Sequence, residues 1–289
     1  MRALEYLAPE HLEEVLEVLA QADPTETVVW AGGTALAPLL RRGLVEPRRL
    51  LGLERVGELA GLSVEDDGSL RIGAVVRLRE LYGAELVRGR LPVLAWTARR
   101  VGNLRVQNMA TVGGHLAHAD PAQDLPPVLL ALDAEVRLQS CRGTRALPLE
   151  EFLLGPMQTA RADDELLTEV RVPPRAFRWR TGYVRYAPRS AEDYPTVGVA
   201  ASVEVDADGV CREARVAVGG AGPKALRVRA AEQVLVGGPL SADRCREAAR
   251  RVEGEVDPWD DTRGSAAYKR AMARVWTERL LRQLAAAGS

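Results

Sequence analysis

Cysteine is the first scarce residue. The 289-residue sequence holds only Cys141, Cys211 and Cys245, far apart and without a CxxC pair. All-cysteine zinc sites, iron–sulfur clusters and disulfide scaffolds need clustered or paired cysteines, so this chain alone builds none of them. Few, scattered cysteines are typical of a reduced, cytoplasmic setting.

Lysine is nearly absent as well. Of the 39 basic residues only Lys224 and Lys269 are lysines, and we interpret the arginine excess as composition bias. The scarcity removes nearly every candidate for a catalytic or phosphate-binding lysine. With 40 acidic residues the net charge is −1, so no global field favours nucleic acid or an anionic membrane.

Long apolar runs are also missing. No stretch of about 18 apolar residues occurs, so no membrane span is predicted. The start, MRALEYLAPEHLEE, lacks the apolar core of a signal peptide. A content of 47% hydrophobic and 27% charged residues is typical of a globular protein, which we expect to be cytoplasmic.

The first half of the chain predicts two units. A helix is indicated from His11 to Ala22 and a strand from Thr27 to Trp30, followed by a glycine turn, a short helix and a second strand. This β-α-β-like opening breaks near Gly57. Beyond it, Asp67-Gly68 predicts a hairpin, and residues 78–87 and 91–101 read as helices.

Residues 102–127 are rich in Gly, Asn, Asp and Pro without clear periodicity, and we interpret them as a long, functional loop. The rest of the chain has a different order of predicted elements, antiparallel strands followed by helices, and this order predicts a separate α+β domain. The strands are expected at 178–185, 197–205 and 211–218, and the helices at 225–235, 241–253 and 265–286. The predicted domains are therefore 1–56, 57–173 and 174–289.

The first motif, AGGTAL, covers Ala31 to Leu36 between a strand and a helix. Glycines there let the backbone approach a ligand, and a helix start offers free N–H groups to phosphate oxygens. The alternative is an ordinary tight turn. The motif is neither a GxGxxG fingerprint nor a Walker A loop.

The second motif, TVGGHLAHADPAQD, covers Thr111 to Asp124 and contains two of the three histidines. His115, His118, Asp120 and Asp124 are possible ligands of zinc or iron, but their spacing matches no known metal motif. The histidines could also be plain polar loop residues. A third reading is a second nucleotide loop, in which Asp124 accepts a hydrogen bond from a sugar or ribityl hydroxyl.

Two Gly-Gly loops about eighty residues apart could clamp one extended diphosphate from both sides. With AGG-T-A, T-V-GG-H, AHADPAQDLPP, LLALDAEV, DELLTEVRVP, VGVAASVEV and SAAYKRAMARV in this order, the chain resembles the FAD-binding subunit of molybdenum hydroxylases. That family includes the medium chain of aerobic carbon monoxide dehydrogenase and the flavin domain of xanthine dehydrogenase. The resemblance spans essentially the whole chain.

The resemblance implies a fold and a set of flavin contacts. The fold is α+β: a two-lobed FAD-binding fold of the p-cresol methylhydroxylase/vanillyl-alcohol oxidase type, followed by a smaller α+β C-terminal domain. Backbone N–H groups along the FAD pyrophosphate would come from Ala31, Gly32, Gly33, Thr34, Ala35 and Leu36. The opposing loop and the cleft beside it would be formed by Thr111, Gly113, Gly114, Asn108, His115 and His118.

Three further contacts follow from the same resemblance. Asp124 would hold an FAD sugar hydroxyl, and Tyr194 would screen the isoalloxazine ring. Leu166 and Leu167 would add main-chain contacts. No side chain is assigned a catalytic role and none a metal.

The chain departs from the family pattern at three places. The usual Ser of the first loop is Ala35, and the usual Asn or Asp after the second Gly-Gly is His115. The common QVRN segment reads RVQN at residues 105–108, which shifts the arginine by two positions. On an extended segment that shift keeps it on the same face.

The resemblance implies an FAD-binding electron-transfer subunit of a molybdenum hydroxylase. It would pass electrons from the 2Fe-2S cluster of an iron–sulfur subunit through FAD to an acceptor such as NAD or a quinone. A third subunit would carry the molybdenum cofactor, in a dimer of heterotrimers. The alternatives are a stand-alone flavin reductase of the same fold and a flavin-free scaffold subunit.

Overall fold

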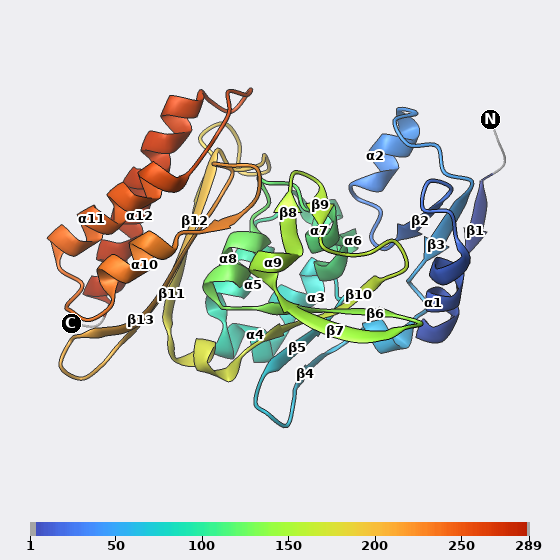
Figure 1. Cartoon of the computed structure of the whole chain (residues 1–289), viewed down its shortest axis with the longest axis horizontal. Helices are drawn as coiled ribbons and strands as arrows, with labels where there is room; N and C mark the ends of the chain where they lie inside the picture. The colour runs from blue at the N-terminus through green and yellow to red at the C-terminus, as the bar shows by residue number, and fades with distance from the viewer. Residues whose placement is uncertain (1–3, 288–289) are drawn as a thin grey trace.

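The computed structural model describes residues 4–287, and its N-terminal lobe is a small parallel sheet with strand order β1-β3-β2. Buried Val15, Leu16 and Leu19 of its first helix pack in one cluster with Leu51 and Leu53. The predicted β-α-β opening is confirmed (Figure 1). Its elements are β1 (Glu5–Leu7), α1 (Leu12–Gln21), β2 (Thr27–Trp30), α2 (Leu36–Arg41) and β3 (Arg49–Gly52).

The second lobe holds an antiparallel sheet of order β4-β5-β10-β6-β7. The predicted hairpin is confirmed: β4 and β5 pair, and Gly68 between them has a φ of +80°, a left-handed turn conformation. The strands are β4 (Leu62–Val64), β5 (Leu70–Gly73), β6 (Glu135–Ser140), β7 (Gly143–Pro148) and β10 (Leu166–Val172). Short elements surround it: the 3-10 turn Gly57–Leu59, α9 (Leu149–Phe152), β8 (Leu153–Gly155) and β9 (Gln158–Thr159).

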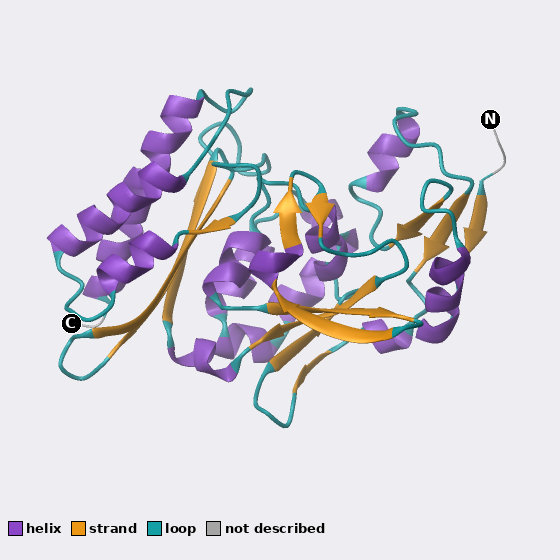
Figure 2. Ribbon diagram, viewed as in Figure 1, coloured by secondary structure: helices purple, strands orange, loops and turns teal. Residues whose placement is uncertain are grey.

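Between these strands the chain forms a group of short helices (Figure 2). Two helices were predicted, at 78–87 and 91–101, but the structure has three in this region. They are α3 (Leu78–Gly83), α4 (Glu85–Arg90) and α5 (Pro92–Ala98). The extended backbone of Ala84 separates the first two. Leu91, whose ψ is 61°, precedes Pro92, which disfavours helical geometry in the residue before it.

The prediction of a long loop at residues 102–127 is wrong. Instead the segment folds into α6 (Leu104–Met109), α7 (Val112–His118) and the start of α8 (Leu125–Ala131). Asn103 and Thr111 cap α6 and α7, since their side-chain oxygens accept hydrogen bonds from Arg105 N at 3.0 Å and Gly114 N at 3.1 Å. Residues 105–108 are therefore helical, and a shift of two positions turns a side chain by about 200°. The displaced arginine does not keep its face.

The C-terminal domain is an antiparallel sheet of order β11-β12-β13-β14 whose two faces are both covered. Helices α10 to α12 lie on one face, and α8 of the second lobe packs on the other (Figure 1). The predicted strands are confirmed. The helix expected from residue 225 begins only at Arg229, because Leu226 pairs with β13.

The C-terminal elements follow the 3-10 turn Pro174–Arg178. They are β11 (Arg180–Tyr186), β12 (Val197–Val205), β13 (Cys211–Gly219), β14 (Leu226–Arg227), α10 (Arg229–Leu235), α11 (Ala242–Glu255) and α12 (Ala266–Ala286). Within residues 4–287, no helix is both long and apolar enough to cross a membrane.

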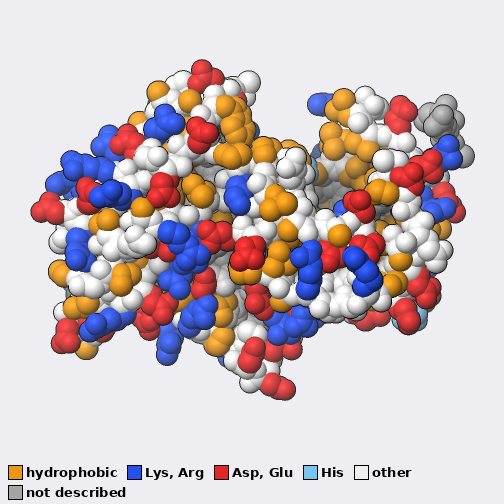
Figure 3. All heavy atoms as spheres, viewed as in Figure 1, with side chains coloured by type: hydrophobic (Ala, Val, Ile, Leu, Met, Phe, Trp, Pro, Cys, Tyr) orange, Lys and Arg blue, Asp and Glu red, His pale blue; other side chains and the backbone are white. Residues whose placement is uncertain are grey.

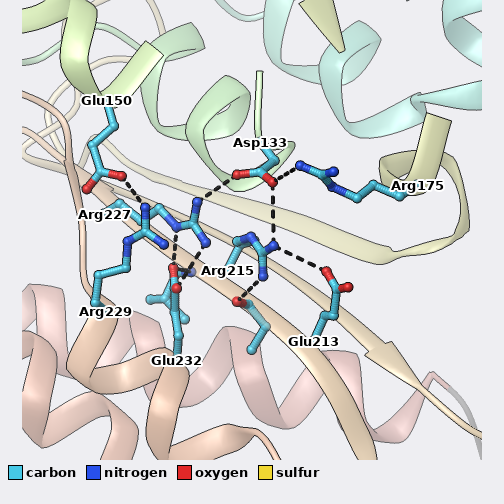
Figure 4. A network of polar contacts seen from close by, with 10 residues as sticks. Asp133, Glu150, Arg175, Glu213, Arg215, Arg227, Arg229 and Glu232 are labelled. Atoms are coloured by element: carbon cyan, nitrogen blue, oxygen red, sulfur yellow. Dashed lines mark hydrogen bonds and ion pairs between the residues drawn. The ribbon is translucent and has the colours of Figure 1, made fainter. Parts of the chain in front are cut away.

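A network of ion pairs joins the second lobe to the C-terminal sheet (Figure 4). Asp133, in the turn after α8, receives Arg175 Nη2 at 2.5 Å, Arg227 Nη1 at 2.7 Å and Arg215 Nη2 at 3.4 Å. Burial raises the pKa of Asp133, but the hydrogen bond from Arg175 and the charges of Arg215 and Arg227 outweigh it and lower this pKa. The carboxylate is thus a charged hub of this interface.

Lys224 adds a second tie between the same two parts. Its ammonium group donates to the carbonyl oxygens of Leu153 at 2.5 Å and Glu150 at 3.3 Å. These carbonyls lie at the end of the short helix α9, where intrahelical partners run out. One of the two lysines of the chain is therefore an interdomain contact.

We expect Asp133→Asn to lower the free energy of unfolding by about 2 kcal/mol, because it weakens charge-assisted hydrogen bonds from three arginines. Asn keeps the shape and tolerates the φ of +58° that Asp133 adopts. Urea unfolding measures the effect. The control is Asp66→Asn in the exposed β4–β5 turn, which should change stability little; equal effects of the two variants would contradict the hub role.

Candidate functional site

A cavity of about 610 Å³ lies where the three parts of the chain meet. Its walls come from the first motif after β2, from α7, from the segment before β10, and from β11 with the loop that follows it. Figure 3 shows the molecule hollowed between the part that carries α2 and its middle. The volume is in the range of small-molecule and cofactor sites.

The first wall is the glycine turn of the AGGTAL motif. Gly33 has a φ of +66°, and a Cβ there would lie 2.3 Å from the Trp30 indole. A Cβ on Gly32 would lie 1.9 Å from the carbonyl oxygen of Met109 at the end of α6. Both positions therefore require glycine, one for its backbone conformation and both for the close approach of neighbouring atoms.

The same turn presents a row of free donors. In the described part of the chain, no protein acceptor takes a hydrogen bond from the N–H of Gly32, Gly33, Thr34, Ala35 or Leu36. The first N–H of α2 that is bonded in this way is that of Ala37, which donates to Gly33 O at 2.8 Å. Five successive N–H groups beside a cavity are suited to an anion such as a phosphate.

The second wall, at the start of α7, gives shape rather than donors. The N–H groups of Val112 and Gly113 already donate to Val76 O and Ala74 O, at 2.9 and 2.8 Å. A Cβ on Gly113 would clash with Ala74 at 2.6 Å, whereas one on Gly114 would meet the Thr111 hydroxyl at 2.9 Å and the Ala31 Cβ at 3.5 Å. Gly114 thus lies directly opposite the first loop.

Both histidines of α7 line the cavity. Burial, with a smaller contribution from His118, lowers the pKa of His115 to about 3, so its imidazole is neutral. His115 Nε2 is buried and has no hydrogen-bond partner. Burial also lowers the pKa of His118, against the opposing charge of Asp120. This unpaired imidazole nitrogen in the cavity wall is available to form a hydrogen bond with a ligand.

Asp124 lines the cavity and is 3% exposed. Its Oδ1 accepts a hydrogen bond from Tyr183 OH at 2.8 Å and lies 3.0 Å from Arg185 Nε. Burial raises the pKa of Asp124, while Arg185 and Tyr183 oppose the rise. Tyr183 and Arg185 reach it from β11, so the C-terminal domain completes this side of the site.

The other predicted residues are placed as follows. Tyr194 lines the cavity and is 43% exposed, with the guanidinium of Arg263 5.9 Å from the centre of its ring. Leu166 and Leu167 line the opposite side, at the start of β10. Asn108 lies outside the lining, contrary to expectation: α6 directs it to Arg79, whose Nη1 donates to Asn108 Oδ1 at 3.2 Å.

Sequence reasoning missed several lining residues. Arg185 and Tyr183 lie two residues apart on one strand, so their side chains point to the same face. That spacing was the signal in the sequence that could have found Arg185. Gln123, whose Oε1 is buried without a partner, lies one position before the predicted Asp124. Trp30 and Arg161 also line the cavity, and no pattern in the sequence marks them.

The unpaired groups together describe the ligand that fits. Free N–H donors line the first wall, and His115 Nε2 and Gln123 Oε1 are buried without a hydrogen-bond partner. Among residues 4–287 there is no group of three His, Cys, Asp or Glu side chains that could hold a metal ion. The cavity therefore fits a ligand with a phosphate at one end and further polar groups along it.

Comparisons with known proteins agree with this chemistry. Residues 2–175 match a family model described as the FAD binding domain in molybdopterin dehydrogenase. Residues 182–284 match the CO dehydrogenase flavoprotein C-terminal domain. The chain is 34% identical over 279 residues to the 6-hydroxypseudooxynicotine dehydrogenase complex subunit alpha of Paenarthrobacter nicotinovorans, covering 96% of this chain and 93% of the relative.

Solved structures share the whole fold. A chain of carbon monoxide dehydrogenase from Hydrogenophaga pseudoflava superposes with a TM-score of 0.91 at 32% identity, covering 96% of this chain and 95% of that one. A chain of quinoline 2-oxidoreductase from Pseudomonas putida 86 gives 0.91 at 32% identity, covering 99% and 98%. The expected p-cresol methylhydroxylase-type FAD-binding fold with a C-terminal α+β domain is confirmed.

His115 makes the flavin-free protein sensitive to acid. The unfolded chain takes up a proton near pH 6.5, whereas the folded protein resists it until about pH 3, so stability falls as the pH drops below 6.5. We expect this residue to cost about 2 kcal/mol between pH 8 and pH 5.

Denaturant unfolding of wild type and His115→Asn at both pH values measures this cost. The variant, which has no imidazole to protonate, should lose less stability than the wild type by that amount. The control is His11→Asn on the surface. Equal acid sensitivity of wild type and His115→Asn would contradict a buried, neutral imidazole.

Proposed function

Because the chain belongs to the family of FAD-binding subunits of molybdenum hydroxylases, we propose that it binds FAD in this cavity and serves as an electron-transfer subunit. It receives electrons from the 2Fe-2S cluster of an iron–sulfur partner subunit and passes them to an acceptor such as NAD or a quinone. A molybdenum-cofactor subunit oxidises the substrate, in a dimer of heterotrimers. The chain divides into domains 1–56, 57–173 and 174–289.

The row of free N–H groups from Gly32 to Leu36 is the observation that carries the proposal. These donors take the FAD pyrophosphate without any lysine, which suits a chain in which Lys224 and Lys269 are engaged elsewhere. Ala35 lacks the usual hydroxyl, but its backbone N–H remains available. Gly114 closes the opposite side without filling the space.

Side chains complete the binding. His115, being neutral, donates from Nε2 to a ligand oxygen without adding charge. Asp124 uses Oδ1 for Tyr183 and Arg185, which leaves Oδ2 for a sugar hydroxyl. Tyr194 borders the cavity from the loop after β11 and shields the isoalloxazine ring. When bound, FAD supplies the redox chemistry, and the protein supplies placement and electrostatics.

The cysteines support the need for a partner. Cys211 and Cys245 are buried, and burial raises the pKa of the Cys211 thiol to about 11 and also raises that of Cys245. Cys141 is exposed and far from both in the sequence. A 2Fe-2S cluster needs four ligands held close together, mostly cysteines, and this sequence has three scattered cysteines, so the iron–sulfur cluster is assigned to another chain.

We expect Gly114→Val to weaken FAD binding at least tenfold, about 1.4 kcal/mol, because the side chain enters the space between the two loops. Titration of flavin-free protein with FAD, followed by protein fluorescence, measures the affinity. The fold should persist, because no backbone atom outside α7 lies within 4 Å of the added Cβ, and its contact with the Thr111 hydroxyl at 2.9 Å costs at most the cap of α7.

The matched control is Gly254→Val in α11, where an added Cβ meets nothing within 4 Å. It places the same side chain on a helix far from the cavity and should leave FAD affinity unchanged. Unchanged affinity in Gly114→Val would show that the flavin does not pass between the two loops.

A further inference from the structure

We propose that Arg185 is a positioning residue that locks Asp124 and the Tyr194-bearing loop into one unit over the cavity. This inference rests on the proposed FAD site and assigns a role that the two glycine motifs do not contain. Arg185 stands on β11, in the C-terminal domain, yet its side chain lines the cavity.

Arg185 makes two separate contacts. Its Nε lies 3.0 Å from Asp124 Oδ1, and its Nη2 donates to the backbone carbonyl oxygen of Asp193. The side chains of Arg185 and Asp124 are only 7% and 4% exposed. One guanidinium makes both contacts, an ion pair with Asp124 and a hydrogen bond from Nη2 to the loop, because its nitrogens form a wide planar fork that a lysine ammonium cannot reproduce.

The loop held by Arg185 joins β11 to β12. Its other side-chain ties run away from the cavity, to the turn before α12: Arg189 Nη1 donates to Thr262 O at 2.6 Å, and Thr196 Oγ1 to Arg263 O at 3.4 Å. Within residues 4–287, Arg185 is therefore the side chain that links this loop to Asp124. Asp193, whose carbonyl oxygen accepts the hydrogen bond from Arg185, immediately precedes Tyr194.

Tyr183 strengthens the unit from the same strand face. Its hydroxyl donates to Asp124 Oδ1 at 2.8 Å, and its ring packs edge-on against Trp96, with 6.2 Å between ring centres. A Cβ on Gly198 would lie 2.4 Å from the Tyr183 hydroxyl, so β12 leaves room for this tyrosine. The Asp124 carboxylate is thereby fixed, and Arg185 transfers that fixed position to the loop.

Burying an ion pair costs desolvation energy, so a gain in folding stability does not by itself account for this pair. Here the pair joins the Asp124 carboxylate, in the wall of the cavity, to the loop between β11 and β12. Without this pair, side chains would hold that loop only on the side of the turn before α12. The physical consequence is the orientation of Tyr194 relative to the isoalloxazine ring. A tyrosine held against a flavin quenches flavin fluorescence, which gives a readout other than enzyme activity.

The test uses the purified chain loaded with FAD. We expect Arg185→Met to retain FAD and to show a severalfold rise in the fluorescence of the bound flavin, and we expect the same rise in Tyr194→Leu. Arg185→Lys, which keeps a cation beside Asp124 and so protects the fold, should fall between the wild type and Arg185→Met. The double variant Arg185→Met/Tyr194→Leu should be no brighter than Tyr194→Leu.

Arg212→Met is the control, since Arg212 forms an exposed ion pair with Asp206 outside the cavity and should not change the fluorescence. Wild-type fluorescence in those Arg185 variants that retain FAD would overturn the inference. So would a further rise when Arg185→Met is added to Tyr194→Leu. Failure of the wild-type chain to take up FAD would instead contradict the proposed function.

Discussion

The site depends on backbones that approach too closely for any side chain. A Cβ on Gly32 would fall 1.9 Å from the Met109 carbonyl oxygen, and one on Gly113 would fall 2.6 Å from the Ala74 Cβ. These contacts bring the first loop against the end of α6, and α7 against Ala74, which directly follows β5. Because they bring two segments eighty residues apart to one place, the free N–H row of the first loop faces Gly114 across the cavity.

The C-terminal domain is part of the same construction. Its strand β11 sends Tyr183 and Arg185 to Asp124, while the arginines of β13 and β14 hold Asp133 at the other end of α8. Helix α8, buried along its whole length, is thus fixed at both ends and packs on the sheet of the C-terminal domain. The cavity wall at Asp124 is therefore joined to that domain at both ends of α8.

The two lysines gain a structural account in this light. Lys224 binds carbonyl oxygens across the interdomain contact, and Lys269 is 2% exposed, with its ammonium group 2.8 Å from Asp261 Oδ2 and 3.0 Å from Trp259 O. A compact ammonium group can serve such clustered oxygens where a planar guanidinium fits less well. The arginine excess elsewhere remains composition bias.

Much of the fold was predictable because its signals are local. Asp67-Gly68 predicts its hairpin, and the valine-rich segments 197–205 and 211–218 predict their strands, from neighbouring residues alone. The helices α6 and α7 were missed because their evidence is a single capping residue each, Asn103 and Thr111, before short and glycine-rich sequence. Arg185 was missed because its partner Asp124 is distant in sequence, and only the packed fold joins them.

The most direct test of the account is the visible absorption spectrum of the purified chain after incubation with FAD and removal of free cofactor. The account predicts a bound flavin band that corresponds to one FAD per chain, since within residues 4–287 the free donor row lines a single cavity. A chain that stays colourless would contradict it and would favour a flavin-free scaffold subunit.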